Sequence, residues 1–332
     1  MQLKGKALFN LLRISWLEDR KSEVKEWQVE DLRELDIKEL FSRLKKLGLI
    51  LNEESFYLYA ENCASPEELI NYIWIETEDL EGHDQTYLLL FELWRRLLPD
   101  KICLSIFCDE LDQLIDLYDK GELEDEEPLQ NALSILEDIL DDSYDKEGDD
   151  ARKFFSEVAS YCAHDLERFI FDYISDQITE KEETYASELI DAFYDYVNDR
   201  GRFDLLRAQL LALFALEESN LIYSRILEEL REESHLELIL LVAESLIHHG
   251  DVRLFMQAIK QALPLLKKEE EFQNLLAMVA EYYRCLDRDE EENMIKGLLD
   301  ARSSHPLNAP VDSSDKAVAQ VSNLISIHLP GP

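Results

Sequence analysis

Glycine and proline are scarce in this chain of 332 residues, with nine and eight copies respectively. The few glycines leave little material for a phosphate-cradling loop, and no Walker A or GxGxxG motif occurs. Because Leu and Glu are the commonest residues instead, the composition is that of helices joined by short turns. We therefore expect an all-α protein.

Long apolar runs are also missing, since no segment approaches the roughly twenty apolar residues of a membrane span. The first apolar run is cut by Arg13 and followed by acids, so we expect no signal peptide. The cysteines are odd in number, scattered and without CxxC spacing: Cys63, Cys103, Cys108, Cys162 and Cys285. This usage predicts reduced thiols and a cytoplasmic protein.

Cations are scarce as well, with 34 Lys and Arg against 73 Asp and Glu and a net charge of −39. The imbalance is local: residues 1–60 hold eleven charges of each sign, whereas residues 61–150 hold 28 acids and five bases. Such a field repels phosphates and anionic lipid, which argues against direct nucleic-acid or membrane binding. It favours a basic protein or basic peptide segment as the partner, with an attraction that weakens as salt rises.

Apolar residues at helical spacing predict most of the chain as helices. Expected among them are single helices over 29–47, ending at Gly48, and over 150–178, with helix starts at Asn52 and at Ser65. We predict an irregular helical-repeat array (α-solenoid) of antiparallel helix pairs, with about 14–15 helices.

Composition divides the chain into four expected regions: a charge-balanced helical region (1–80), an acidic, aromatic-rich helical region (81–200), helical pairs (201–302) and a tail rich in Ser and Pro (303–332). We expect the tail to be loosely attached, with one short helix near Asp315–His328.

The helical pairs repeat with a period in the thirties: "VAESLIHHGD" from Val242 recurs as "VAEYYRCLDRD" from Val279. Together with the following "VRLFMQAIKQALP", the first copy resembles a tetratricopeptide repeat, with small and apolar Ala243, Leu246, Ala262 and Leu263 and the Gly250–Asp251 turn. It departs from that family at two positions. Phe255 stands where the family prefers alanine, and Asp287 replaces the turn glycine in the second copy.

The resemblance implies that the first helix of each pair lines a groove for an extended segment or a helix. The inward positions would be Glu237, Leu240, Glu244, His248, Asn274, Ala277, Glu281 and Arg284. Ordinary helix surface is the alternative for these residues.

Residues 121–150 contain thirteen carboxylates and one lysine. As an EF-hand they fail, because Phe154 falls at the twelfth position, where a bidentate glutamate is needed. Two acidic turns at the ends of one amphipathic helix are expected instead, either as a docking rim for a basic partner or as solvated turns. The rim residues are Glu124, Asp125, Glu126, Glu127, Asp141, Asp142 and Asp145.

No catalytic, cofactor or metal-ligand pattern accompanies these features: HExxH, GxSxG and paired Glu-x-x-His motifs are absent. His248 and His249 precede Gly250 at a helix end, where capping explains them. The sequence therefore predicts a non-enzymatic scaffold or adaptor without cofactor or metal, whose acidic surface binds a basic protein segment. The alternatives are a chaperone or secretion-cargo handler, a nucleic-acid mimic, and an enzyme whose site no motif reveals; the oligomeric state stays open.

Overall fold

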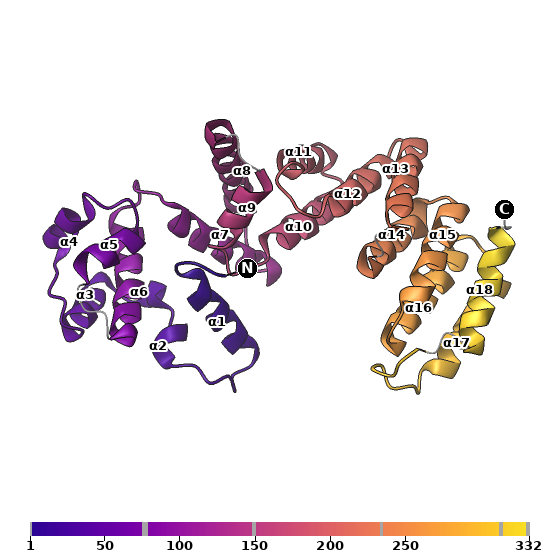
Figure 1. Ribbon diagram of the computed structural model, residues 1–332, viewed down its shortest axis with the longest axis horizontal. Helices are drawn as coiled ribbons and strands as arrows, with labels where there is room; N and C mark the ends of the chain where they lie inside the picture. The colour runs from indigo at the N-terminus through magenta and orange to yellow at the C-terminus, as the bar shows by residue number, and fades with distance from the viewer. Residues whose placement is uncertain (1, 75–78, 148–150, 233–234, 312–314, 330–332) are drawn as a thin grey trace. The chain divides into compact units, whose positions relative to one another are not determined.

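The computed structural model describes residues 2–74, 79–147, 151–232, 235–311 and 315–329. These residues form 18 α-helices and two 3₁₀ helices and contain no strand (Figure 1). Neighbouring helices pack in pairs, which confirms the predicted all-α helical-repeat class. The chain divides into two compact units, residues 1–170 and 171–332.

The helices up to the boundary are α1 (Ala7–Glu18), α2 (Glu26–Val29), η1 (Leu32–Glu34), α3 (Ile37–Lys46), α4 (Glu53–Ala60), α5 (Pro66–Ile73), α6 (Leu80–Leu97), α7 (Leu104–Asp119), α8 (Glu127–Glu147) and α9 (Ala151–Ala159). Helix α10 (Leu166–Glu180) contains the boundary. Beyond it lie α11 (Glu183–Phe193), α12 (Arg200–Ala212), α13 (Leu216–Glu229), α14 (Leu236–His249), α15 (Val252–Ala262), η2 (Leu263–Leu265), α16 (Glu269–Cys285), α17 (Asp289–Arg302) and α18 (Lys316–His328).

The core of the first unit is built around α6. All nine residues from Thr86 to Trp94 are buried, so this helix is covered on every side, as a central helix must be. Helices α3 and α5 pack against it, and Phe56 of α4 joins the same apolar cluster. The helices around α6 therefore share an apolar centre, and α4 packs one side on it and turns the other outward.

Several predicted helix ends are confirmed in their atomic detail. Asn52 and Ser65 accept hydrogen bonds from the backbone N–H of Ser55 (2.8 Å) and Glu68 (3.2 Å) at the starts of α4 and α5. Gly48 has φ +91°, the left-handed conformation in which the chain leaves α3. Local side-chain chemistry is sufficient to fix these ends.

Two predicted helices are wrong in their continuity, which raises the helix count above the expected 14–15. The segment 29–47 is divided between α2, η1 and α3, because Asp36 caps a new start by accepting from Glu39 N at 2.9 Å. The segment 150–178 breaks after α9, where the backbone turns to donate to Asp112, and α10 starts anew after Asp165.

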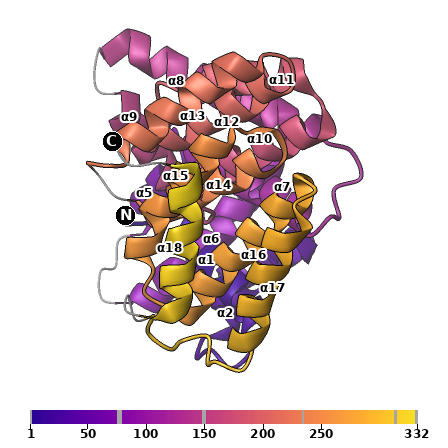
Figure 2. The same cartoon turned by 90° about the vertical axis from the view of Figure 1, so that its right-hand side faces the viewer.

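The second unit places the first helices of successive pairs side by side. Helix α14 packs against both α12 and α16, while the second helices α13 and α15 pack together (Figure 2). Between the layers, Phe255 lies flat on Tyr282, with ring centroids 3.8 Å apart and planes 10° apart. This arrangement is compatible with a generic helical repeat.

Asp287 performs the role of a turn glycine after α16. Its φ is +53°, a left-handed value that aspartate tolerates better than most residues. The backbone N–H of Arg288 closes the turn on Tyr283 O at 3.0 Å. The departure from glycine seen in the sequence thus leaves the turn geometry intact.

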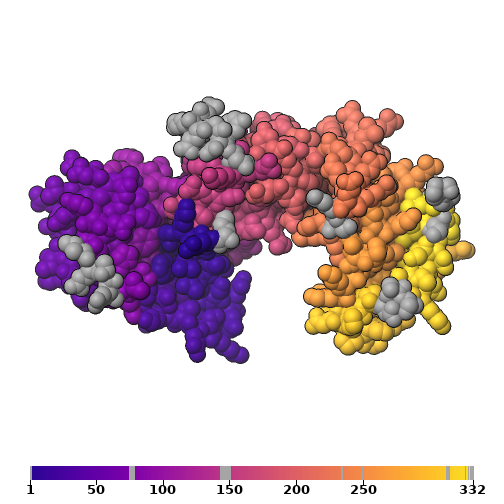
Figure 3. Space-filling view, in the orientation of Figure 1, coloured from indigo at the N-terminus to yellow at the C-terminus, as the bar shows by residue number. Residues whose placement is uncertain are grey.

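The tail is bound to the second unit, contrary to the expectation of loose attachment. Residues 307–311 exchange backbone hydrogen bonds with residues 267–270, at 2.8–3.1 Å. Arg302 Nη1 lies 2.6 Å from Asp315 Oδ2, just before α18, and Arg302 also forms an ion pair with Glu269. Helix α18 then packs on α15, so the tail is continuous with the surface of this unit (Figure 3).

Replacing Gly250 by alanine should destabilise the second unit by about 1–3 kcal/mol. An added Cβ would lie 2.3 Å from Leu246 Cδ2 and 2.8 Å from the Cα of the same residue, so the backbone between α14 and α15 would have to move. The matched control is Gly297→Ala in α17, where nothing lies within 4 Å of the added carbon. That variant should stabilise the unit by up to about 1 kcal/mol. Hydrogen exchange of the α14 and α15 amides measures both effects, and an unchanged Gly250→Ala protein would contradict the packing.

Candidate protein-interaction surfaces

The eight positions that the repeat resemblance indicated lie on two neighbouring helices, α14 and α16. Their side chains are exposed or half-exposed, whereas Val242, Ala243 and Leu246 of α14 are buried. The exposed residues are Glu237, Glu244, His248, Asn274, Ala277 and Arg284, and the half-exposed ones are Leu240 and Glu281. Within their own helices these residues therefore occupy the side that turns away from the core.

Two of the three carboxylates among these eight positions already have arginine partners. Arg202 Nη2 lies 2.8 Å from Glu237 Oε1, and Arg284 pairs with Glu281. The hydrogen bond from Arg284 lowers the pKa of Glu281. Of these three, only Glu244 lacks an ion pair to a described basic side chain, so the eight positions offer less free negative charge than their sequence indicated.

The acidic segment of residues 122–127, which ends on the first residue of α8, offers more free negative charge. Glu124, Asp125 and Glu127 are exposed, and so is Glu122 just before them, while Glu126 is half-exposed. The nearest cation in the sequence is Lys120, which follows the last residue of α7. Its Nζ lies 2.6 Å from Asp116 Oδ2, so it forms an ion pair with α7. No described basic side chain pairs with Glu122, Glu124 or Glu127.

The second acidic segment is helical, not a turn as predicted. Helix α8 continues to Glu147, so Asp141 and Asp142 lie within it and are exposed. The side chain of Asp145 and all of residues 148–150 lie outside the described part of the chain. The helix continues beyond Leu140, which is the last buried apolar residue of α8 whose side chain the structure describes.

A buried ion cluster, which the sequence did not reveal, ties α1 to α7. Asp109 of α7 is only 3% exposed and lies 2.8 Å from Lys6 Nζ and 2.6 Å from Arg33 Nη2. Asn10 Nδ2 also donates to it at 2.9 Å. Burial opposes ionisation, but Lys6 and Arg33 outweigh it and lower the pKa of Asp109 to about 2.

Asp112 extends this cluster to the break between α9 and α10. It accepts hydrogen bonds from the backbone N–H of Ala163 and His164, at 2.8 and 3.1 Å. His164 Nδ1 lies 3.0 Å from Asp112 Oδ1, and this contact raises the pKa of His164 although burial alone would lower it. Asp109, Asp112 and His164 line a cavity of about 280 Å³. Their polar atoms are hydrogen-bonded to protein groups, which is typical of a network that stabilises the fold.

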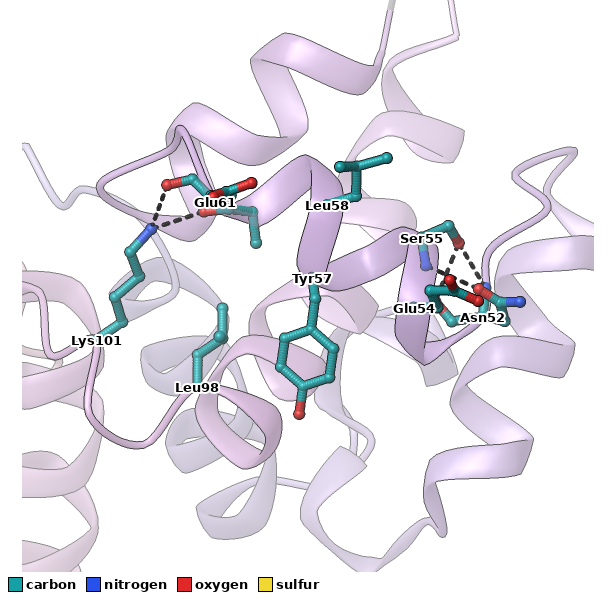
Figure 4. Close-up of a pocket in the computed structure, with 9 residues that line it drawn as sticks. Asn52, Glu54, Ser55, Tyr57, Leu58, Glu61, Leu98 and Lys101 are labelled. Atoms are coloured by element: carbon teal, nitrogen blue, oxygen red, sulfur yellow. Dashed lines mark hydrogen bonds between the residues drawn. The ribbon is translucent and has the colours of Figure 1, made fainter.

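A larger hollow of about 760 Å³ opens beside α4 (Figure 4). It is lined by Asn52, Glu54, Ser55, Tyr57, Leu58, Ala60, Glu61, Leu98 and Lys101. Leu58 is 67% exposed and Tyr57 43%, although both are large apolar side chains. The sequence contained a signal for this exposed apolar surface in the run of four large side chains Phe56–Tyr59. A helix that buries one face cannot bury four consecutive large side chains, so some of them must be exposed.

Two hydrogen-bond groups fix the walls of this hollow. Lys101 Nζ donates to the carbonyl oxygens of Ala60, Glu61 and Cys63, at 2.7, 3.0 and 2.8 Å. It thereby caps the carboxyl end of α4. The hydroxyl of Tyr57 donates to Leu97 O at 3.2 Å. Hydrogen bonds therefore hold the Lys101 and Tyr57 side chains in place at the wall of the hollow.

No protein-family model, curated protein or solved structure matches this chain. No described helix is both long enough and apolar enough to cross a membrane. In the described part of the chain, no three His, Cys, Asp or Glu side chains are grouped so that they could hold a metal ion.

Replacing Asp109 by asparagine should destabilise the first unit at neutral pH by about 3 kcal/mol, because Lys6 and Arg33 lose their buried counter-ion. The pKa of about 2 lies below the unfolded value of about 3.9, so the stabilisation is complete above pH ~5 and is lost as the pH falls towards 2. The stability difference between the two proteins should therefore shrink over that interval.

Urea unfolding followed by tryptophan fluorescence measures this difference for the first unit alone, because all four tryptophans lie in residues 16–94. Asp138→Asn, at an exposed position on α8, is the control and should leave stability nearly unchanged. A difference that stays constant from pH 7 to 2 would contradict the assigned role of Asp109.

Proposed function

We propose that this protein is a non-enzymatic scaffold or adaptor whose acidic surface binds a basic protein segment. The observation that carries the proposal is the acidic segment of residues 122–127, where Glu122, Glu124 and Glu127 are exposed without a described cationic partner. Carboxylates that lack internal cations raise the local concentration of basic ligands and speed their encounter. Direct nucleic-acid or membrane binding has no support in such a surface.

We further propose that the helical pairs of the second unit form a tetratricopeptide-like array. The buried Ala243, Leu246 and Ala262 support it, as does the close turn at Gly250. Phe255 replaces the alanine that the family prefers, and its ring is accommodated by stacking on Tyr282. In such an array the exposed side of α14 and α16 is a second docking face, with Glu244 as its unpaired carboxylate.

An enzymatic role has weaker support. The best candidate for a catalytic constellation is the cluster of Asp109, Asp112 and His164, whose polar atoms are already occupied. Asp109, with its pKa of about 2, is not poised to exchange protons near neutral pH. We place the protein in the cytoplasm because all five cysteines are free thiols.

Neutralising the acidic segment of residues 122–127 should abolish binding of the partner. The test variant combines Glu122→Gln, Glu124→Gln, Asp125→Asn and Glu127→Gln. The partner is retained from native extract at low and at high salt and is identified by mass spectrometry. We expect a basic protein that the wild type retains at low salt, releases at high salt, and that the variant loses at both.

The control carries four changes on exposed acids elsewhere, Glu182→Gln, Glu183→Gln, Glu228→Gln and Glu229→Gln, and so has the same net charge. It should retain the partner as the wild type does. If both variants lost the partner equally, binding would depend on net charge alone and not on residues 122–127. A partner whose retention does not change with salt would contradict the proposal. A partner that becomes insoluble without this protein would instead favour a chaperone or secretion-cargo handler.

A further inference from the structure

One side of α4 carries an apolar centre between two carboxylates. Glu54, Tyr57, Leu58 and Glu61 follow one another at i, i+3, i+4 and i+7, the spacing of a single helical face, and all four are exposed. The opposite side of α4 buries Phe56 and Ala60 in the core of the unit. We name these four residues the α4 stripe: Glu54, Tyr57, Leu58 and Glu61.

The α4 stripe has a hollow beside it that could receive a side chain. Leu98 and Lys101 form its other wall, and the volume of about 760 Å³ is large enough for several side chains. Figure 4 shows Tyr57 and Leu98 on the same side of α4, with Glu61 at one end and Glu54 at the other. Apolar surface lies in the middle and acid lies at both ends.

The two carboxylates at the ends of the α4 stripe have no described ion-pair partner, whereas the ammonium group of the neighbouring Lys101 is fully hydrogen-bonded. No described basic side chain forms an ion pair with Glu54 or Glu61. Lys101 directs its ammonium group at three carbonyl oxygens at the end of α4, so its donors are used by the helix itself. A ligand cation therefore meets two open carboxylates about 10 Å apart along the helix.

We propose that the α4 stripe is a docking site for a basic amphipathic helix of another protein. The complementary helix has two adjacent apolar residues that cover Tyr57 and Leu58, with an arginine or lysine one turn before them and another one turn after. Those cations lie opposite Glu54 and Glu61, and an arginine can also stack on the exposed Tyr57 ring. The inference rests on the proposed function in one respect, since both take the partner to be a basic protein segment.

The test uses synthetic helical peptides and the purified full-length chain. The probe is a fluorescent helix with two central leucines flanked on each side by an arginine one turn away. The comparison peptide has glutamate in both arginine positions. Fluorescence anisotropy should show at least about tenfold tighter binding of the arginine peptide at low salt, with a difference that narrows as salt is added.

Two variants locate the binding on α4. Leu58→Ser should weaken the arginine peptide at least about tenfold, while the control Leu221→Ser, at a position 71% exposed in α13, should leave it unchanged. The double variant Glu54→Lys and Glu61→Lys should reverse the preference and bind the glutamate peptide. The matched double variant Glu182→Lys and Glu183→Lys should keep the original preference.

Equal affinity for the two peptides would overturn the inference, and so would a Leu58→Ser protein that binds like the Leu221→Ser control. These outcomes leave the proposed function standing if the extract still yields a salt-sensitive basic partner that requires the acidic segment of residues 122–127. Conversely, peptide binding at α4 without any such partner would contradict the proposed function and leave the α4 site in place.

Discussion

The shortage of cations is the constraint on which this structure depends. With 34 bases for 73 acids, every carboxylate that enters the interior must take one of few available partners, because an unpaired buried charge is far more costly than an exposed one. Asp109 takes Lys6 and Arg33, and Glu269 takes Arg302. The surplus of negative charge is therefore left at the surface by the same contacts that hold the interior together.

Those contacts also connect segments that are far apart in sequence. Lys6 and Asn10 of the amino-terminal segment reach Asp109 of α7, and Arg302 joins the start of α16 to the tail. Other cations serve helix ends: Arg96 donates to the carbonyl oxygens of Leu32, Arg33 and Leu35, and Lys101 caps α4. Because these bases are used in this way, the exposed acids of residues 122–127 and of the α4 stripe are left for external cations.

The sequence was sufficient where local chemistry decides the structure. The helix starts at Asn52 and Ser65 and the end at Gly48 were predictable, since each depends on residues three or four positions away. The break at Asp36 could also have been found, because Glu39 three residues later is a capping signal. The break between α9 and α10 could not, because its backbone donates to Asp112, about fifty residues earlier in the chain. The α4 hollow likewise needs Leu98 and Lys101 from beyond α6, and the bound tail needs the start of α16.

The central claim is that the exposed acids form an interaction surface and do not serve solubility alone. Zero-length carbodiimide coupling in native extract tests it most directly, because it joins a carboxylate only to a lysine in contact with it. The account predicts intermolecular links from Glu54, Glu61 and the acids of residues 122–127 to lysines of one basic partner. Intermolecular links spread evenly over exposed acids such as Glu182, Glu183 and Glu228, or none at all, would contradict it.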